Sequence, residues 1–239
     1  MTAIKKTISA ARQLASAVNS LRFAEPVAYV YNPLDYAWRA HQCYLEMMNP
    51  LVTEVLFLGM NPGPWGMAQT GVPFGHVPTV RDWLHIDARI DPPVRMHPKR
   101  PIEGLNCQRA EVSGERLWGL FRERFKSPQQ FFEKHFVTNY CPLVFMEESG
   151  RNRTPDKLPA GERASLQAVC DAHLAAVLNA VKPRIAVGVG AYAEQCFQRV
   201  IGERPIEVIR ILHPSPASPA ANRGWAEAVT KQLVDAGVW

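Results

Sequence analysis

Short apolar runs alternate along the chain with longer segments in which apolar residues recur every three or four positions. The runs at 54–59, 136–140, 184–189 and 207–212 predict four buried strands. The clearest helix, 162–181, has one apolar face. That face is made of Leu166, Val169, Leu174, Val177, Leu178 and Val181. Strands that alternate with helices predict an α/β fold of three layers, with helices on both faces of a four-stranded parallel sheet.

Other helical patterns precede the first strand, separate the strands and follow the last one. Ser127 and Pro128 mark one helix start, because serine caps a helix and proline suits its first turn. We expect the N-terminal helices, about 4–48, to pack on the core of a single domain that spans residues 1–239. In chain order the expected helices are 4–22, 35–48, 114–126, 128–135, 162–181, 191–201 and 219–236, with a short one beginning at Arg81.

Three segments lack a regular period. Residues 60–82 are rich in Gly and Pro, 91–112 form a basic irregular excursion, and 146–161 read as a polar surface loop. Long loops without regular structure are uncommon in compact domains unless they carry function. The first of these segments is therefore a place to look for a site.

Composition and charge exclude several classes of protein. The chain has 239 residues, a net charge of +5 and a pI near 9.0, which favours a polyanionic partner only weakly. Its five cysteines include no C-x-x-C pair, which argues against a zinc ribbon, an iron–sulfur cluster or a disulfide framework. No apolar run approaches the ~20 residues that span a bilayer. We expect reduced thiols, no metal, no cofactor and no membrane association.

Two segments more than 140 residues apart carry most of the chemistry. GMNPGPWGM at 59–67 and HPSP at 213–216 each follow a predicted strand, and loops at the carboxyl ends of strands form the ligand crevice of an open α/β sheet. They offer the Asn61 amide and the His213 imidazole, with no carboxylate nearby. This pair suits a reaction that needs a positioned water and a stabilised departing anion. The alternatives are that Asn61 is only a turn residue and His213 only structural.

Phe74 and Asn139 are further candidates for the same crevice. A ring in the rigid loop around Phe74 can stack on a planar base, or it can plug the core beneath the loop. Asn139 ends the second predicted strand. Its amide offers a donor and an acceptor that match the O4 and N3–H of uracil, but it can equally cap the strand.

Other catalytic motifs are incomplete. Gly188-Val189-Gly190 follows the third predicted strand, but no full G-x-G-x-x-G follows the first one. No phosphate-binding G-x-x-x-x-G-K-[ST] loop occurs. Ser215 lies near His213 without the G-x-S-x-G pattern of a serine hydrolase.

Taken together, these segments resemble the single-strand-selective monofunctional uracil-DNA glycosylases, a branch of the uracil-DNA glycosylase superfamily. The resemblance extends over roughly residues 25 to 235 and implies a four-stranded parallel sheet with flanking helices. It also suggests a bacterial member. The matching segments are FLGMNPGPWGMAQTGVPFGHVPTVRDWL (57–84), HPKRPIEGLNCQRAEVSGERLWG (97–119), VTNYCPLVF (137–145) and HPSPASPAANRGW (213–225).

The resemblance implies a role for each candidate in the crevice. Asn61 would orient the attacking water, and a neutral His213 would donate a hydrogen bond to the charge that develops on uracil O2. Phe74 would stack on a base flipped out of the DNA, and Asn139 would read its edge. The remaining implied pocket residues, near C5 of the base, are Met60, Gly63 and Met67.

The resemblance also implies a DNA-binding surface and one departure from the family. The animal members carry an arginine, part of the wedge that fills the gap left by the flipped base, where this chain has Ala217. We therefore expect weaker duplex engagement, a preference for single strands, or a substitute wedge from Arg223. Trp65 and His76 also differ from the commonest animal residues. The expected DNA contacts are Ser215, Pro216, Ala217, Arg223, Lys99 and Arg100, with Arg109 as a further basic residue. The alternative for the basic side chains is solvated surface.

The activity implied is that of a monofunctional DNA glycosylase of base excision repair. It would hydrolyse the N-glycosidic bond of uracil, and of oxidised uracils such as 5-hydroxymethyluracil, in single- and double-stranded DNA and leave an abasic site. No lysine stands in the motif as a Schiff-base nucleophile, so we expect no lyase activity. We expect a monomer with DNA as its partner and an intracellular location, in the cytoplasm or nucleoid of a bacterium.

Three alternatives stay open at this point. A glycosylase of the same superfamily could prefer deaminated purines such as xanthine or hypoxanthine. A non-catalytic nucleic-acid-binding module could have kept the pocket without turnover, although the presence of both Asn61 and His213 argues against this. A serine hydrolase using Ser215 has the least support.

Overall fold

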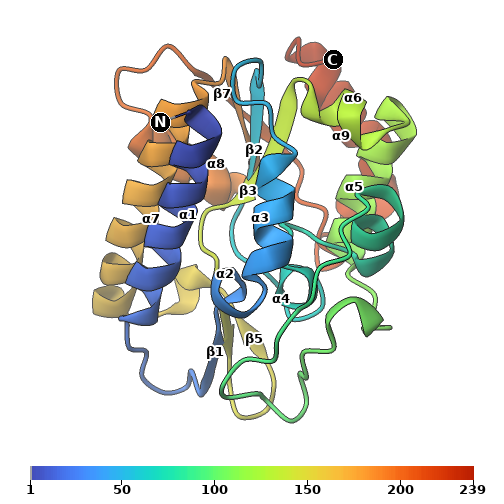
Figure 1. The fold of residues 1–239 in the computed structure, drawn as a ribbon. Helices are drawn as coiled ribbons and strands as arrows, with labels where there is room; N and C mark the ends of the chain where they lie inside the picture. The colour runs from blue at the N-terminus through green and yellow to red at the C-terminus, as the bar shows by residue number, and fades with distance from the viewer. Residues whose placement is uncertain (1) are drawn as a thin grey trace.

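The computed structural model describes residues 2–239, and a parallel sheet of four strands runs through its centre (Figure 1). The strands are β2 (Val55–Gly59), β3 (His135–Asn139), β6 (Ile185–Val189) and β7 (Glu207–Ile211), arranged in the order β3-β2-β6-β7. The prediction of four parallel strands between helical layers is confirmed, and each strand lies within a residue or two of its expected position.

Burial explains why these strands could be read from the sequence. Every residue of β2 and β6 is buried, because helices cover both faces of the sheet. β7 lies at an edge and is only partly buried. Figure 1 shows the two helical layers. One layer holds α1 (Ala3–Asn19), α7 (Ala160–Val181) and α8 (Ala191–Val200), and the other holds α5 (Val112–Phe125), α6 (Pro128–Phe132) and α9 (Trp225–Asp235).

The N-terminal helices pack on this core, as expected. α1 lies along α7 (Figure 1) and buries Leu14 and Val18. The helix expected at 35–48 is instead two helices, α2 (Pro33–Tyr36) and α3 (Trp38–Glu46). The first of them begins earlier than expected because the Asn32 side chain accepts from the Leu34 amide and proline occupies the first turn.

α7 is a long and largely apolar helix. By length and composition alone it is long and apolar enough to cross a membrane, the only such helix in residues 2–239. A core helix of a globular protein meets the same criterion. α7 buries Leu166, Leu174 and Leu178, and its Asp171 forms an ion pair with Arg199 of α8.

A second, antiparallel sheet was not expected. It consists of β1 (Tyr29–Tyr31), β4 (Val144–Met146) and β5 (Asn152–Arg153). Strands of two or three residues are too short for a period of two to be visible in a sequence. The segment expected as a polar loop at 146–161 therefore contributes the end of one strand and all of another, followed by a 3₁₀ turn at Pro155–Lys157.

The two irregular excursions are ordered because a buried glutamine joins them. Gln69 is fully buried, and its amide nitrogen donates to the carbonyls of Pro64 (3.0 Å) and Pro101 (2.9 Å). Its carbonyl oxygen accepts from the amides of Glu103 and Gly104 (2.8 and 3.2 Å). The first excursion also contains α4 (Met67–Thr70), which the sequence did not indicate. The short helix expected to begin at Arg81 is a π-helical turn at Thr79–Trp83, which begins two residues earlier.

The remaining differences concern helix ends. The helix expected at 128–135 stops at Phe132, because His135 begins β3. The helix expected at 219–236 is a 3₁₀ turn at Ala221–Arg223 followed by α9, since Gly224 adopts a left-handed conformation with φ of 108°. A further 3₁₀ turn lies at Gly104–Asn106.

His135 is a buried base surrounded by aromatic rings. Its ring centroid lies 4.8 Å from that of Phe125 and 5.4 Å from that of Phe131. Nδ1 is 3.2 Å from the Phe131 carbonyl, whereas Nε2 has no hydrogen-bond partner. Burial lowers the pKa of His135 to about 4.

We expect His135 to contribute to acid unfolding. Its pKa is about 4 in the folded protein against an ordinary 6.5, so between these values the unfolded chain binds more protons and the free energy of unfolding falls as pH drops. The full shift corresponds to about 3 kcal/mol. His135→Phe removes this group at similar volume, and urea unfolding at about pH 7.5 and about pH 5 should show a smaller decrease in the variant. An equal decrease in both proteins would contradict the assignment.

Candidate functional site

A cleft of ≈ 350 Å³ opens at the carboxyl ends of β2, β3 and β7. It brings together segments more than 140 residues apart in the sequence. The residues expected at the site that line it are Met60, Asn61, Gly63, Met67, Phe74, Asn139, His213 and Ser215. The predicted position of the site, at the edge where parallel strands end, matches this arrangement.

The Asn61 side chain has a fixed orientation. Its amide nitrogen donates to the carbonyl of Leu143 at 3.0 Å and to that of Pro62 at 3.2 Å. Two carbonyl acceptors on one side identify that atom as the nitrogen, because an amide oxygen there would face two other oxygens. The Asn61 Oδ1 atom is therefore left to accept a hydrogen bond in the cleft.

The His213 imidazole is fixed in one neutral tautomer. The backbone N–H of Ser215 donates to His213 Nδ1 at 3.1 Å, so Nδ1 is an acceptor and the proton resides on Nε2. Burial lowers the pKa of His213, and no carboxylate is among the causes of the shift. Gly190, at the end of β6, allows the ring to pack close to the backbone: a Cβ there would lie 3.2 Å from the His213 Cβ. The site thus presents a neutral N–H donor.

The loop that carries His213 is held by a helix on the other side of the cleft. Arg116 of α5 donates to the Pro214 carbonyl at 3.0 Å and to Asn222 Oδ1 at 2.9 Å. Asn222 in turn donates to the Pro216 carbonyl at 2.9 Å. These bonds keep the HPSP segment at the mouth of the cleft. Arg116 was not a candidate from the sequence.

Phe74 and Asn139 meet over Gly59, the last residue of β2. Gly59 pairs with Asn139 across the parallel strands, and a Cβ on Gly59 would overlap both Asn139 Oδ1 and the Phe74 ring. The Phe74 ring centroid lies 6.4 Å from that of His213, with an interplanar angle of 47°. Phe74 also has φ of 55°, a left-handed conformation uncommon for a non-glycine residue, and such residues cluster at binding sites.

Asn139 leaves one polar atom without a partner. The side chain is 7% exposed, and its nitrogen contacts the Met67 sulfur at 3.4 Å. Its oxygen, Oδ1, has no hydrogen bond within the described chain. A buried unsatisfied acceptor is costly, and its presence in a cleft indicates that a ligand supplies the missing donor.

Several residues of the cleft were not candidates from the sequence, although Pro62 and Gly66 lie inside the segment at 59–67. They are Pro62, Gly66, Glu111, Ser113, Asn152 and Thr154. Glu111 and Ser113 come from the start of α5, and the last two from the unexpected second sheet and the turn after it. The expectation that no carboxylate lies near Asn61 and His213 is wrong, because tertiary packing brings Glu111 into the same cleft. No periodicity marks a side chain that reaches a site from a distant loop. A polar or acidic residue at a helix start is usually explained by capping alone.

The expected DNA contacts form two groups at the rim. In the first, the Arg100 guanidinium lies 5.3 Å and the Arg109 guanidinium 5.6 Å from the Trp65 ring, beside the loop that carries Asn61. Lys99 is exposed next to this group. The second group follows the His213 loop and consists of the exposed Pro216, Ala217 and Arg223, next to the partly exposed Ser215.

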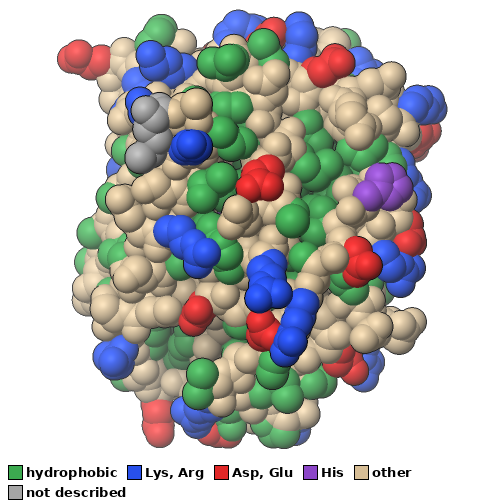
Figure 2. All heavy atoms as spheres, in the orientation of Figure 1, with side chains coloured by type: hydrophobic (Ala, Val, Ile, Leu, Met, Phe, Trp, Pro, Cys, Tyr) green, Lys and Arg blue, Asp and Glu red, His purple; other side chains and the backbone are tan. Residues whose placement is uncertain are grey.

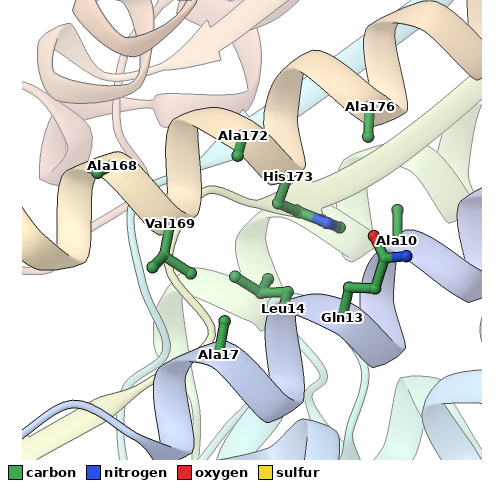
Figure 3. Close-up of a pocket in the computed structure, with 9 residues that line it drawn as sticks. All are labelled: Ala10, Gln13, Leu14, Ala17, Ala168, Val169, Ala172, His173 and Ala176. Carbon is green, nitrogen blue, oxygen red and sulfur yellow. The ribbon is translucent and has the colours of Figure 1, made fainter.

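A second groove, between α1 and α7, does not bring together a set of polar groups as the cleft does. Figure 3 shows His173 pointing from α7 toward Ala10 of α1. Burial lowers the pKa of His173 to about 4, and the Ala10 carbonyl opposes this shift. The rest of the lining is apolar or small, apart from Gln13. Within residues 2–239 no group of three or more His, Cys, Asp or Glu side chains is arranged to hold a metal ion.

The fold and the cleft together define a class of protein. The family model described as the uracil DNA glycosylase superfamily matches residues 46–233, a range that contains every residue lining the cleft. The crystal structure of SMUG2 from Pedobacter heparinus aligns with 95% of this chain and 97% of that chain, with a TM-score of 0.65. At 14% identity this likeness supports the fold alone.

Relatives with higher sequence identity identify the family within this superfamily. The single-strand selective monofunctional uracil-DNA glycosylase of Rattus norvegicus is 50% identical over 228 residues, which cover 95% of this chain and 82% of that protein. The Mus musculus protein is 49% identical with the same coverage, and the Bos taurus protein is 49% identical over 91% of this chain and 80% of its own length. The chain belongs to the family of single-strand-selective monofunctional uracil-DNA glycosylases.

The close approach over Gly59 makes a direct prediction about base binding. In Gly59→Ala the new methyl must displace the Phe74 ring or the Asn139 amide, so we expect loss of activity on DNA of about 100-fold or more, while the thermal unfolding temperature changes by only a few degrees. Gly119→Ala is the matched control, because a Cβ at Gly119 meets nothing within 4 Å. Activity within a few-fold of wild type in Gly59→Ala would contradict the described geometry.

Proposed function

We propose that this protein releases uracil from DNA by hydrolysing the N-glycosidic bond and leaves an abasic site. The observation that carries this proposal is that Asn61 and His213 line one cleft, beside an aromatic ring and an unpaired amide acceptor, while hydrogen bonds occupy the Asn61 nitrogen and His213 Nδ1. We infer that the Asn61 oxygen and the His213 Nε2–H act on the substrate. The names and similarity of the relatives support the same activity. Oxidised uracils with a substituent at C5, in single- and double-stranded DNA, are included in the proposal.

Recognition of the base rests on Phe74 and Asn139. A flipped base stacks on the Phe74 ring, and the buried Asn139 Oδ1 accepts from N3–H of uracil. Cytosine has an unprotonated N3, which would place two acceptors face to face. A site whose buried acceptor stays unpaired rejects that ligand strongly, so Asn139 discriminates uracil from cytosine.

Bond cleavage needs a stabilised leaving group more than a strong base. As the bond between C1′ and N1 breaks, the electron pair moves onto the uracil ring, and His213 Nε2–H donates a hydrogen bond to O2, where charge accumulates. Because burial lowers the pKa of His213, the imidazole is neutral at neutral pH. The N–H of a neutral imidazole is too weak an acid to transfer its proton to the uracil anion, so it acts as a hydrogen-bond donor only.

Water completes the reaction. The sugar is left as an oxocarbenium-like electrophile, which a neutral water can attack at C1′. Asn61 Oδ1 accepts a hydrogen bond from this water and orients it; an amide is too weakly basic to deprotonate it, and the proton leaves to the uracil anion or to solvent. Among the described residues that line the cleft there is no lysine, so no amine is placed to form a Schiff base and cut the strand.

DNA contact is proposed for both groups at the rim. Trp65 with Arg100 and Arg109 offers an aromatic face among cations, a combination suited to single-stranded DNA. On the face drawn in Figure 2, Lys and Arg side chains are spread over the surface, with Asp and Glu side chains among them. At the other group the Ala217 methyl cannot fill the space of a flipped base. We therefore propose weaker duplex engagement than in relatives with arginine there.

The function is tested by a panel of single-lesion oligonucleotides that contain uracil, 5-hydroxymethyluracil, xanthine or hypoxanthine. We expect uracil release, and a decrease of about 10²–10³-fold in both Asn61→Ala and His213→Ala, because each removes one group that acts on the transition state. His85→Asn, which changes an exposed histidine outside the cleft, is the control. Wild-type release no faster than that of the variants, or release of purine lesions without uracil, would overturn the proposal.

The rim contacts are tested by the salt dependence of binding. Arg100→Gln and Arg109→Gln should each weaken binding to a single-stranded oligonucleotide and lower the slope of log K against log salt by about 0.7 for each lost phosphate contact. Arg184→Gln is the control. Arg184 precedes the amino end of β6, at the end of the strands opposite to the cleft, so its substitution should leave the slope unchanged. Equal slopes in all four proteins would remove these arginines from the DNA-binding surface.

A further inference from the structure

Glu111 is a carboxylate in the cleft that the proposed mechanism does not use. It lies at the start of α5 and lines the same cavity as Asn61. Its Oε2 sits between two glycines of the first motif: a Cβ on Gly63 or on Gly66 would lie 3.2 Å from that atom. The loop thus curves around this carboxyl group, and any side chain at either glycine would crowd it.

The surroundings of Glu111 are unusual for a carboxylate. Burial raises the pKa of Glu111, and the backbone amide of Ser113 only partly opposes this. None of the ion pairs found among residues 2–239 involves it. Glu111 is partly buried. A partly desolvated acid without a cation is costly to keep in a structure, and such groups concentrate where a ligand binds.

In the proposed orientation of the base, Glu111 lies next to the edge that carries C5. Around the uracil ring, O2, N3, O4 and C5 follow one another. With O2 at His213 and N3–H at Asn139, O4 and then C5 lie further round the ring, beyond Asn139 and away from His213. The neighbour of Asn139 there is Met67, whose sulfur is 3.4 Å from the Asn139 nitrogen. Gly66 precedes Met67, and Glu111 lies against Gly66.

We propose that Glu111 is a specificity-determining residue that accepts a hydrogen bond from a hydroxyl-bearing substituent at C5 of the base. This inference rests on the proposed function and deepens it. Carboxyl oxygens accept a hydrogen bond from a hydroxyl group directly or through one water. A methyl group at C5 offers no donor and would strip water from the carboxylate without replacing it, so the same residue disfavours thymine.

Glu111 has one competing explanation, a brace that supports the loop from Gly63 to Gly66. The two roles differ in what a substitution does to different substrates. A brace affects all bases alike, because it acts through the shape of the whole cleft. A group that contacts the C5 substituent changes the ratio between substrates. The ratio of kcat/KM for 5-hydroxymethyluracil to that for uracil therefore separates them.

The test uses two substitutions in the full-length chain. Glu111→Met keeps an unbranched side chain of similar length but removes the acceptor, and we expect the ratio to fall about 10-fold or more, with thymine release rising relative to uracil. Glu111→Gln keeps one carbonyl acceptor and should retain more of the ratio. Glu115→Gln, exposed one turn further along α5, is the control in which the ratio stays at the wild-type value.

Each possible result either supports or overturns the role proposed for Glu111. Equal loss on uracil and 5-hydroxymethyluracil in a folded Glu111→Met identifies a brace and overturns the proposal, and so does an unchanged ratio. If Glu111→Met does not fold, Glu111→Gln decides instead: a fall in the ratio, smaller than that expected for methionine, supports the proposal, whereas an unchanged ratio or equal loss on both substrates overturns it. Wild-type protein that releases uracil but not 5-hydroxymethyluracil would overturn this inference alone, whereas the absence of uracil release would overturn the proposed function itself.

Discussion

The pairing of β2 with β3 is the constraint on which the rest of the site depends. Its register sets Gly59 opposite Asn139 at the end of the two strands. Only the missing side chain of Gly59 leaves room for the Asn139 oxygen and the Phe74 ring at the same point. A shift of one residue would turn every strand side chain to the opposite face. The fully buried β2 prevents such a shift, so the hydrophobic core fixes the position of polar groups that it does not itself contain.

Burial then gives these polar groups their chemistry. His213 is neutral because water is largely excluded around it, and its tautomer is set by one backbone amide from Ser215. Asn61 faces the cleft with its oxygen because two carbonyls hold its nitrogen. In both residues, hydrogen bonds to backbone groups decide which side-chain atom is the donor and which is the acceptor. These backbone groups are held rigidly and carry no charge. A preorganised neutral site of this kind stabilises a departing anion without reorganisation, which is where electrostatic catalysis has its largest effect.

Much of this arrangement could be predicted from the sequence, and the limits have physical causes. Four apolar runs indicated the sheet, and the residues after two of them, Asn61 and His213, indicated the cleft, since parallel strands end at one edge. The second sheet was missed because its strands are too short to show a period. Glu111 and Arg116 were missed because α5 reaches the site through tertiary packing. An acid at a helix start is explained locally by the helix dipole, and an arginine on a helix is usually a solvated surface residue, so neither signals a ligand in the sequence.

A crystal structure with DNA that contains an abasic site and with free uracil would show how the cleft holds the base. We expect uracil to stack on Phe74, with its O2 within hydrogen-bond distance of His213 Nε2, its N3–H at Asn139 Oδ1 and a water held by Asn61 near C1′. Uracil bound elsewhere, or a base in the cleft with its O2 turned away from His213, would contradict this expectation.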